Sequence, residues 1–132
     1  MFDHTADVGI EARGATLEEC FANAALATFS VMTDLSSVQP LLRQNVTVDG
    51  ADLEDVLVGW LNELLYISTV EQVLFSRFDV SRVTPTSLEA VALGERMDPA
   101  RHRLLTEIKA ATYHRVKVEH NDEWRAHVIL DL

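Results

Sequence analysis

The chain has 132 residues and a mass of 14.8 kDa, a size that suits one domain with its own apolar core. Hydrophobic residues make up 48% and charged residues 24% of it, so disordered and fibrous classes are excluded. No stretch approaches the ~18 apolar residues of a membrane span, and the N-terminus lacks the layout of a signal peptide. With one cysteine, no internal disulfide can form. These features predict a single domain over residues 1–132 in a cytoplasmic protein without membrane contact.

The net charge of the chain limits the kinds of partner that it can bind. Eleven lysines and arginines stand against 21 acidic residues, which gives a net charge of −10. A protein that grips nucleic acid by itself needs a basic surface, so direct nucleic-acid binding is disfavoured. The acidity lies mostly in the first half, because residues 1–66 carry a net charge of −9 and residues 67–132 carry −1. For the second half, a solvated surface of mixed charge is the favoured interpretation, and a local patch that meets an acidic partner or a phosphate is the alternative.

The first half predicts two helices, each preceded by a strand. Residues 8–13 alternate weakly and predict a short strand. Thr16 begins a capping box, followed by apolar residues at helical spacing that predict a helix over residues 16–32. Residues 45–49 predict a second strand, and Asp52 is a suitable N-cap for a second helix. The apolar residues behind it follow a 3.6-residue period: Leu53, Val56, Leu57, Trp60, Leu61, Leu64 and Leu65.

From residue 73 onward the apolar period becomes two. Four segments rich in Val, Ala, Leu, Thr and Tyr predict strands, with turn residues between them: residues 73–83, 87–94, 104–118 and 124–130. Helices early in the chain and strands late in it favour an α+β fold. We expect a single-domain sandwich in which two helices pack on one face of a mainly antiparallel sheet.

Most catalytic motifs are absent from the sequence. The five glycines are too scattered for a phosphate loop, and neither a GxSxG nor an HExxH motif occurs. The five histidines lack the short paired spacings that are typical of zinc sites. Cys20 and Trp60 both lie on apolar helical stripes, which favours core packing for each over a nucleophile or a ligand platform.

The two chain ends carry the most suggestive acidic groups. Asp7 precedes the first predicted strand, and Asp131 and Leu132 follow the last one. If these two strands are neighbours, both side-chain carboxylates and the α-carboxylate of Leu132 meet, and such oxygens suit Ca²⁺ or Mg²⁺. From the residues alone, a plain exposed terminus is the favoured interpretation and a cation site is the alternative.

Six sequence words, taken together and in order, resemble the archease family over nearly the whole chain. They are residues 4–9 (HTADVG), 16–21 (TLEECF), 31–34 (VMTD), 61–66 (LNELLY), 107–114 (EIKAATYH) and 128–132 (VILDL). The segment that often precedes the HTAD word in the family is nearly missing here. The resemblance implies a compact α+β sandwich, in agreement with the element order derived above.

What the resemblance implies about function is a non-enzymatic activator. Archeases assist the RtcB-type RNA ligase of tRNA splicing and RNA repair, which uses GTP and a divalent metal and is charged with GMP on a histidine. The archease promotes this guanylylation and so restores multiple turnover. Contact with RNA and GTP is then indirect, through the ligase. The family's metal site corresponds to Asp7, Asp131 and Leu132, and its functional lysine corresponds to Lys109.

Two other function classes remain open. A general chaperone-like module would need an exposed apolar patch. A metal-dependent phosphoester hydrolase could use the same terminal carboxylates, but no motif places a nucleophile or a base beside them.

Overall fold

The structure, a computed structural model, describes residues 6–132. This part of the chain contains two α-helices, a short 3-10 helix and six strands. In chain order they are β1 (Asp7–Gly14), α1 (Leu17–Met32), η1 (Leu35–Ser37), β2 (Leu42–Asp49), α2 (Leu53–Glu71), β3 (Val73–Thr84), β4 (Ser87–Arg96), β5 (Ala110–Asn121) and β6 (Glu123–Asp131). The predicted α+β class is confirmed. Neither α1 nor α2 has the length and apolar character that crossing a bilayer would require.

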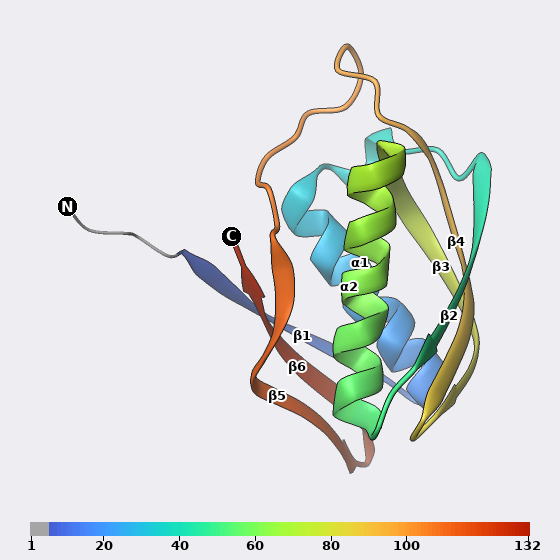
Figure 1. Cartoon of the computed structure of the whole chain (residues 1–132), viewed down its shortest axis with the longest axis vertical. Coiled ribbons are helices and arrows are strands. Elements are labelled where there is room, and N and C mark those ends of the chain that lie inside the picture. The colour runs from blue at the N-terminus through green and yellow to red at the C-terminus, as the bar shows by residue number, and fades with distance from the viewer. Residues whose placement is uncertain (1–5) are drawn as a thin grey trace.

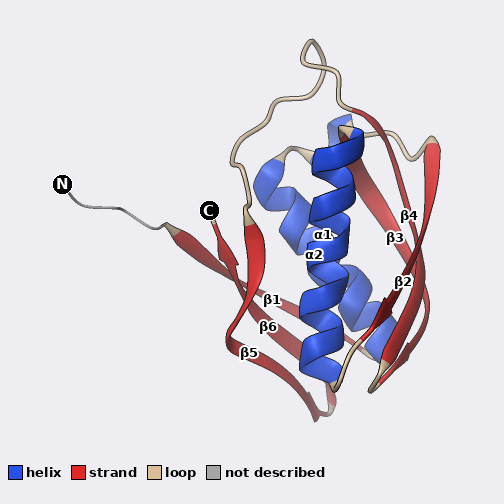
Figure 2. Ribbon diagram, viewed as in Figure 1, coloured by secondary structure: helices blue, strands red, loops and turns tan. Residues whose placement is uncertain are grey.

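The strands form two antiparallel sheets rather than one. Their orders are β1-β6-β5 and β2-β4-β3, and both helices lie between them (Figures 1 and 2). α1 packs mainly on β1 and β3, whereas α2 packs mainly on β5 and β2. Helices covered by a sheet on two sides need a wide apolar surface. Val58 illustrates this, because it is fully buried although it lies off the predicted apolar stripe of α2.

The predicted helix starts and core residues are confirmed. Thr16 Oγ1 accepts the N–H of Glu19 at 3.1 Å, and Asp52 Oδ1 accepts the N–H of Asp55 at 2.8 Å. Each side chain satisfies a donor that the first helical turn leaves free. Trp60 is fully buried and its Nε1 donates to the carbonyl oxygen of Phe21 at 2.9 Å, so the indole ties α2 to α1 within the core.

The strand predicted over residues 104–118 is wrong in its first part. β5 begins only at Ala110, and residues 97–109 form a long crossover from β4 to the other sheet (Figure 1). In the middle of this passage Leu104 makes an isolated bridge with Thr33, and no further strand forms before β5. Further along, β5 has an irregularity between Thr112 and Lys117, with Arg115 in the left-handed region at φ 55°.

We expect Gly94→Ala to destabilise the protein by about 2–3 kcal/mol. Gly94 lies in the central strand β4, paired with β2 on one side and β3 on the other. A Cβ at this position would lie 1.8 Å from the main-chain oxygen of Leu74, and a backbone atom in a sheet cannot rotate away. The midpoint of urea unfolding measures the loss.

Gly9→Ala is the matched control. A Cβ at Gly9 would meet only the side chain of His127, at 3.4 Å. Because glycine weakens a strand by its conformational freedom, this variant should be as stable as the wild type or slightly more so. Equal losses in the two variants would contradict the steric argument.

Candidate functional site

Asp7 and Asp131 face each other at the end of the β1–β6 ladder. They are direct partners in the antiparallel register, followed by the pair Val8 and Leu130. Because strand side chains alternate between faces and Leu130 is buried against the helices, both aspartates lie on the outer face of the sheet. Asp7 is exposed and Asp131 is half-buried.

The last residue and Lys109 join this pair through main-chain hydrogen bonds. The N–H of Leu132 donates to the carbonyl oxygen of Ala6 at 3.0 Å, so the pairing of β1 with β6 continues to the end of the sequence. On the other side, the N–H of Lys109 donates to the carbonyl oxygen of Asp131 at 2.8 Å. The start of β1, the end of β6 and the start of β5 therefore meet at one corner, beside the C-terminus in Figure 1.

The electrostatics of this corner favour a positively charged ligand. Side chains directly opposite in an antiparallel pair have Cβ atoms roughly 4.5–5.5 Å apart, where like charges repel. The ion pairs among the described residues involve neither Asp7 nor Asp131. Between residues 6 and 132, no three His, Cys, Asp or Glu side chains converge. A cation here would therefore need oxygens from the main chain or the terminus as well, and hard cations accept such ligands.

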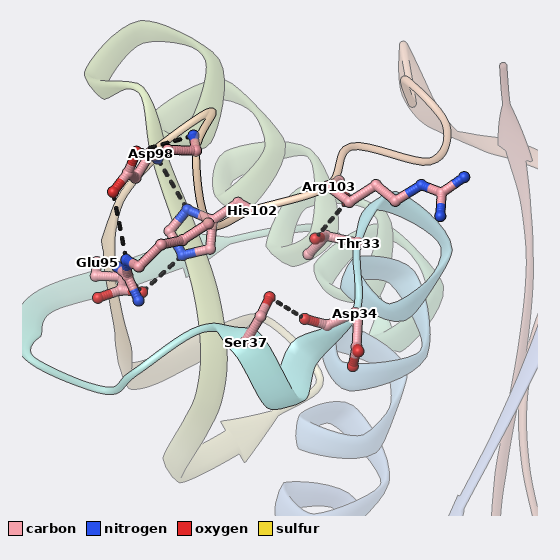
Figure 3. Close-up of polar contacts among 9 residues, drawn as sticks. Thr33, Asp34, Ser37, Glu95, Asp98, His102 and Arg103 are labelled. Atoms are coloured by element: carbon pink, nitrogen blue, oxygen red, sulfur yellow. Dashed lines mark hydrogen bonds and ion pairs between the residues drawn. The ribbon is translucent and has the colours of Figure 1, made fainter.

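The crossover that delivers Lys109 is anchored to the end of α1. Thr33 Oγ1 donates to the carbonyl oxygen of Arg103 at 2.8 Å (Figure 3), and the N–H of Leu105 donates to the carbonyl oxygen of Met32 at 2.8 Å. The segment is thus fixed four residues before Lys109. Ile108 is buried and Lys109 is exposed.

A buried carboxylate secures the first part of the same crossover. Glu95 Oε1 accepts a hydrogen bond from Arg101 at 2.7 Å and lies 2.6 Å from Nε2 of His102. Since the N–H of Asp98 donates to Nδ1 of His102 at 2.8 Å, the imidazole proton is on Nε2 and points at Glu95 (Figure 3). Burial raises the pKa of the Glu95 carboxyl, but the hydrogen bonds from Arg101 and His102 outweigh it and leave that pKa below its usual value.

Comparison with known proteins agrees with this fold. The model of the Archease protein family (MTH1598/TM1083) matches residues 1–132. An archease of Sulfurisphaera tokodaii is 45% identical over 125 residues, covering 94% of this chain and 90% of that protein. An archease of Methanosarcina acetivorans is 42% identical over 135 residues, covering 98% and 92%.

The chain belongs to the archease family.

Two solved structures match this archease-family fold. The solution structure of protein 1598 of Methanobacterium thermoautotrophicum has a TM-score of 0.81 and 40% identity, covering 99% of this chain and 96% of that one. The crystal structure of a Thermotoga maritima protein, described as an archease and possible chaperone, has a TM-score of 0.72. It is 22% identical and covers 100% and 95% of the two chains, so it supports the fold alone.

The structure brings together the residues that the sequence singled out. Asp7, Lys109, Asp131 and Leu132 share one corner, although their roles stay predictions. Of the HTAD word, residues 4 and 5 lie outside the described part of the chain. Sequence reasoning missed the pair of Glu95 and His102, because Glu95 lies near the end of β4 and His102 in the crossover, and no regular spacing links a strand residue to a loop residue.

Cys20 is not a nucleophile in this fold. It is fully buried, and desolvation by burial, reinforced by the charges of Glu123 and Glu19, raises the pKa of its thiol to about 11. The thiol therefore stays protonated at neutral pH, as its place on the apolar stripe of α1 predicts.

We expect Glu95→Gln to lower the melting temperature at neutral pH and to have a smaller effect in acid. The folded protein holds the pKa of Glu95 below the ordinary 4.5. Stabilisation by the ionised carboxylate is thus complete above pH 4.5. It is lost as the pH falls through the lower pKa that Glu95 has in the folded protein. Melting curves from about pH 7 to about pH 3 measure the difference between the two proteins.

Glu89→Gln is the control, because Glu89 makes only an exposed ion pair with Arg82 at 3.4 Å. Its melting temperature should follow that of the wild type throughout the range. A deficit of Glu95→Gln that is constant with pH would contradict the assignment of Glu95 as an ionised anchor.

Proposed function

We propose that the chain is a non-enzymatic activator of an RtcB-type RNA ligase, in tRNA splicing or RNA repair, and that it promotes guanylylation and multiple turnover of the ligase. Membership of the archease family supports this proposal. The observation that carries it is the corner where Asp7 of β1, Asp131 of β6 and Lys109, the residue before β5, come together. This corner therefore presents both negative and positive charge to a docking partner.

The acidic part of this corner fits a divalent cation, Ca²⁺ or Mg²⁺. Asp7 and Asp131 supply side-chain carboxylates, and a polypeptide that ends at Leu132 adds its α-carboxylate. All of these are oxygen ligands of the kind that hard cations prefer. A cation bound here would supply positive charge toward the phosphates of GTP or the acidic groups of the ligase active site.

The chain's own contribution is to favour one state of the ligase. A bound partner shifts a conformational equilibrium only by its different affinity for the two states. Lys109 presents an exposed ammonium group at the corner, and the crossover behind it is anchored at Thr33 and Glu95. The charged group of Lys109 is therefore held in one place, which suits binding to a ligase state in which GTP and metal are correctly arranged.

A general chaperone-like function is the second candidate. Several large apolar side chains are exposed, as a protein that holds unfolded clients requires. They are Leu41, Leu42, Tyr66, Val70, Leu104, Leu105 and Tyr113. Protection of unrelated aggregating proteins would favour this candidate, whereas dependence on one ligase favours the first. For a phosphoester hydrolase, no third His, Cys, Asp or Glu side chain among residues 6–132 joins the aspartate pair as a base or nucleophile.

The decisive experiment is a multiple-turnover ligation assay with an RtcB-type ligase, with and without this chain. The wild type should raise the number of ligations per ligase well above one. We expect Lys109→Glu to reduce this stimulation by about tenfold, a loss of ~1.4 kcal/mol of coupling, while its stability changes by less than about 0.5 kcal/mol.

Lys117→Glu makes the same charge change at another exposed lysine, which lies within β5, and should stimulate like the wild type. Equal stimulation by both variants would remove Lys109 from the mechanism. No stimulation by the wild type, together with protection of aggregating clients, would favour the chaperone-like function.

We expect Asp7→Ala to weaken divalent binding without destabilising the metal-free protein. Removing one of two facing carboxylates takes away a ligand and also their mutual repulsion. The dissociation constant for Ca²⁺, measured by calorimetry, should rise by about tenfold or more, while the melting temperature in EDTA should be unchanged or higher. Glu11→Ala, an exposed acid on the same strand, is the control and should bind Ca²⁺ like the wild type. Unchanged Ca²⁺ affinity in folded Asp7→Ala would refute the proposed site.

A further inference from the structure

Asn62 of α2 makes two hydrogen bonds to the main chain of a single residue in β5. Its Oδ1 accepts the N–H of Ala111 at 2.8 Å, and its Nδ2 donates to the carbonyl oxygen of Ala111 at 3.0 Å. A side-chain amide carries the same donor and acceptor as a peptide group. Asn62 therefore binds Ala111 as a neighbouring strand would.

This contact lies on the open edge of β5, on the side opposite β6. In the order β1-β6-β5, β5 is the edge of its sheet, so half of its main-chain groups face away from β6. α2 packs against this edge, and a buried N–H or carbonyl without a partner would be costly there. The amide of Asn62 satisfies both groups of Ala111 and fixes the height of β5 along the helix.

We propose that Asn62 is a positioning residue for Lys109, an inference that rests on the proposed function. Ala111 is two residues after Lys109, Ala110 is the register partner of Asp131, and the N–H of Lys109 donates to the Asp131 carbonyl. The hydrogen bond from the Lys109 N–H to the Asp131 carbonyl holds Lys109 beside Asp131. It lies between two anchors of the chain, Leu105 on Met32 and Ala111 on Asn62. By binding Ala111, Asn62 fixes β5 in the position at which the Lys109–Asp131 hydrogen bond forms.

A second tie between α2 and β5 allows a matched comparison. The hydroxyl of Tyr113 donates to Oδ1 of Asp55 at 2.6 Å, and this hydrogen bond is the largest cause that lowers the pKa of the Asp55 carboxyl. It joins the same helix to the same strand. It lies, however, two residues beyond Ala111 and next to the irregularity after Thr112, on the side away from Lys109. Its loss should loosen β5 without moving Lys109.

The test compares Asn62→Ala and Asn62→Asp with Tyr113→Phe. Asn62→Asp is nearly isosteric and can still accept the Ala111 N–H, but it sets a carboxylate oxygen against the Ala111 carbonyl. The first measurement uses the protein alone. Amide hydrogen exchange at Lys109 and Ala111 should be at least about tenfold faster in both Asn62 variants, with unchanged exchange at Val128 in the middle of β6. In Tyr113→Phe, exchange at Lys109 should equal that of the wild type.

The second measurement is the ligation assay, titrated with each variant. A positioning role predicts a maximal stimulation about tenfold lower in both Asn62 variants, because Lys109 is misplaced after docking. The concentration for half-maximal stimulation should change less than about threefold, since the docking surface is intact. A role in stability alone would leave the maximum unchanged, and Tyr113→Phe should keep both values.

The outcomes separate this inference from the proposed function. If the wild type stimulates the ligase and the Asn62 variants reach the same maximum, the positioning role is overturned and the proposed function stands. Unchanged exchange at Lys109 overturns it as well, and so does loss of the fold in both variants, which would assign Asn62 to global stability. If the wild type does not stimulate the ligase, the proposed function fails and the inference with it.

Discussion

Both sheets bury one face on the same pair of helices, and the rest of the structure depends on this shared helical layer. Phe29 of α1 packs edge-on against Phe75 of β3, at 5.7 Å between ring centres, while Trp60 of α2 donates to the carbonyl of Phe21. Such contacts place α1 and α2 between the two sheets (Figure 1). The chain must therefore pass from the β2-β4-β3 sheet to the β1-β6-β5 sheet around the end of this layer.

That passage explains the side-chain hydrogen bonds of the crossover. A segment that belongs to neither ladder lacks strand partners for its main chain, so side chains supply them. Within the crossover, Thr33 binds the carbonyl of Arg103 and His102 accepts the N–H of Asp98. Just after it, Asn62 binds both main-chain groups of Ala111 on the open edge of β5. These contacts come from α1, the loop itself and α2 in turn. These contacts hold Lys109, the residue before β5, at the corner where Asp7 and Asp131 are paired.

Sequence periodicity could predict the helices and strands, but not that the strands are divided between two sheets. The capped helices at Thr16 and Asp52 depend on local chemistry, and local chemistry is readable in one sequence. Residues 104–109 alternate like a strand, yet only their position between two sheets decides that they form none. The corner was predictable only on the condition that the first and last strands are neighbours. Asn62 was not predictable as an anchor, because its partner Ala111 is 49 residues away.

The ladder between β1 and β6 contains a useful internal comparison for the aspartate pair. Arg13 and Arg125 are also direct partners with like charge, but Glu123 lies 3.7 Å from Arg13 and relieves their repulsion. Asp7 and Asp131 face each other without such an ion pair among the described residues. A sheet that neutralises one like-charged pair and leaves the other uncompensated, at the corner where Lys109 is held, keeps a repulsion that a bound cation would remove. The proposed cation site rests on this difference between the two like-charged pairs.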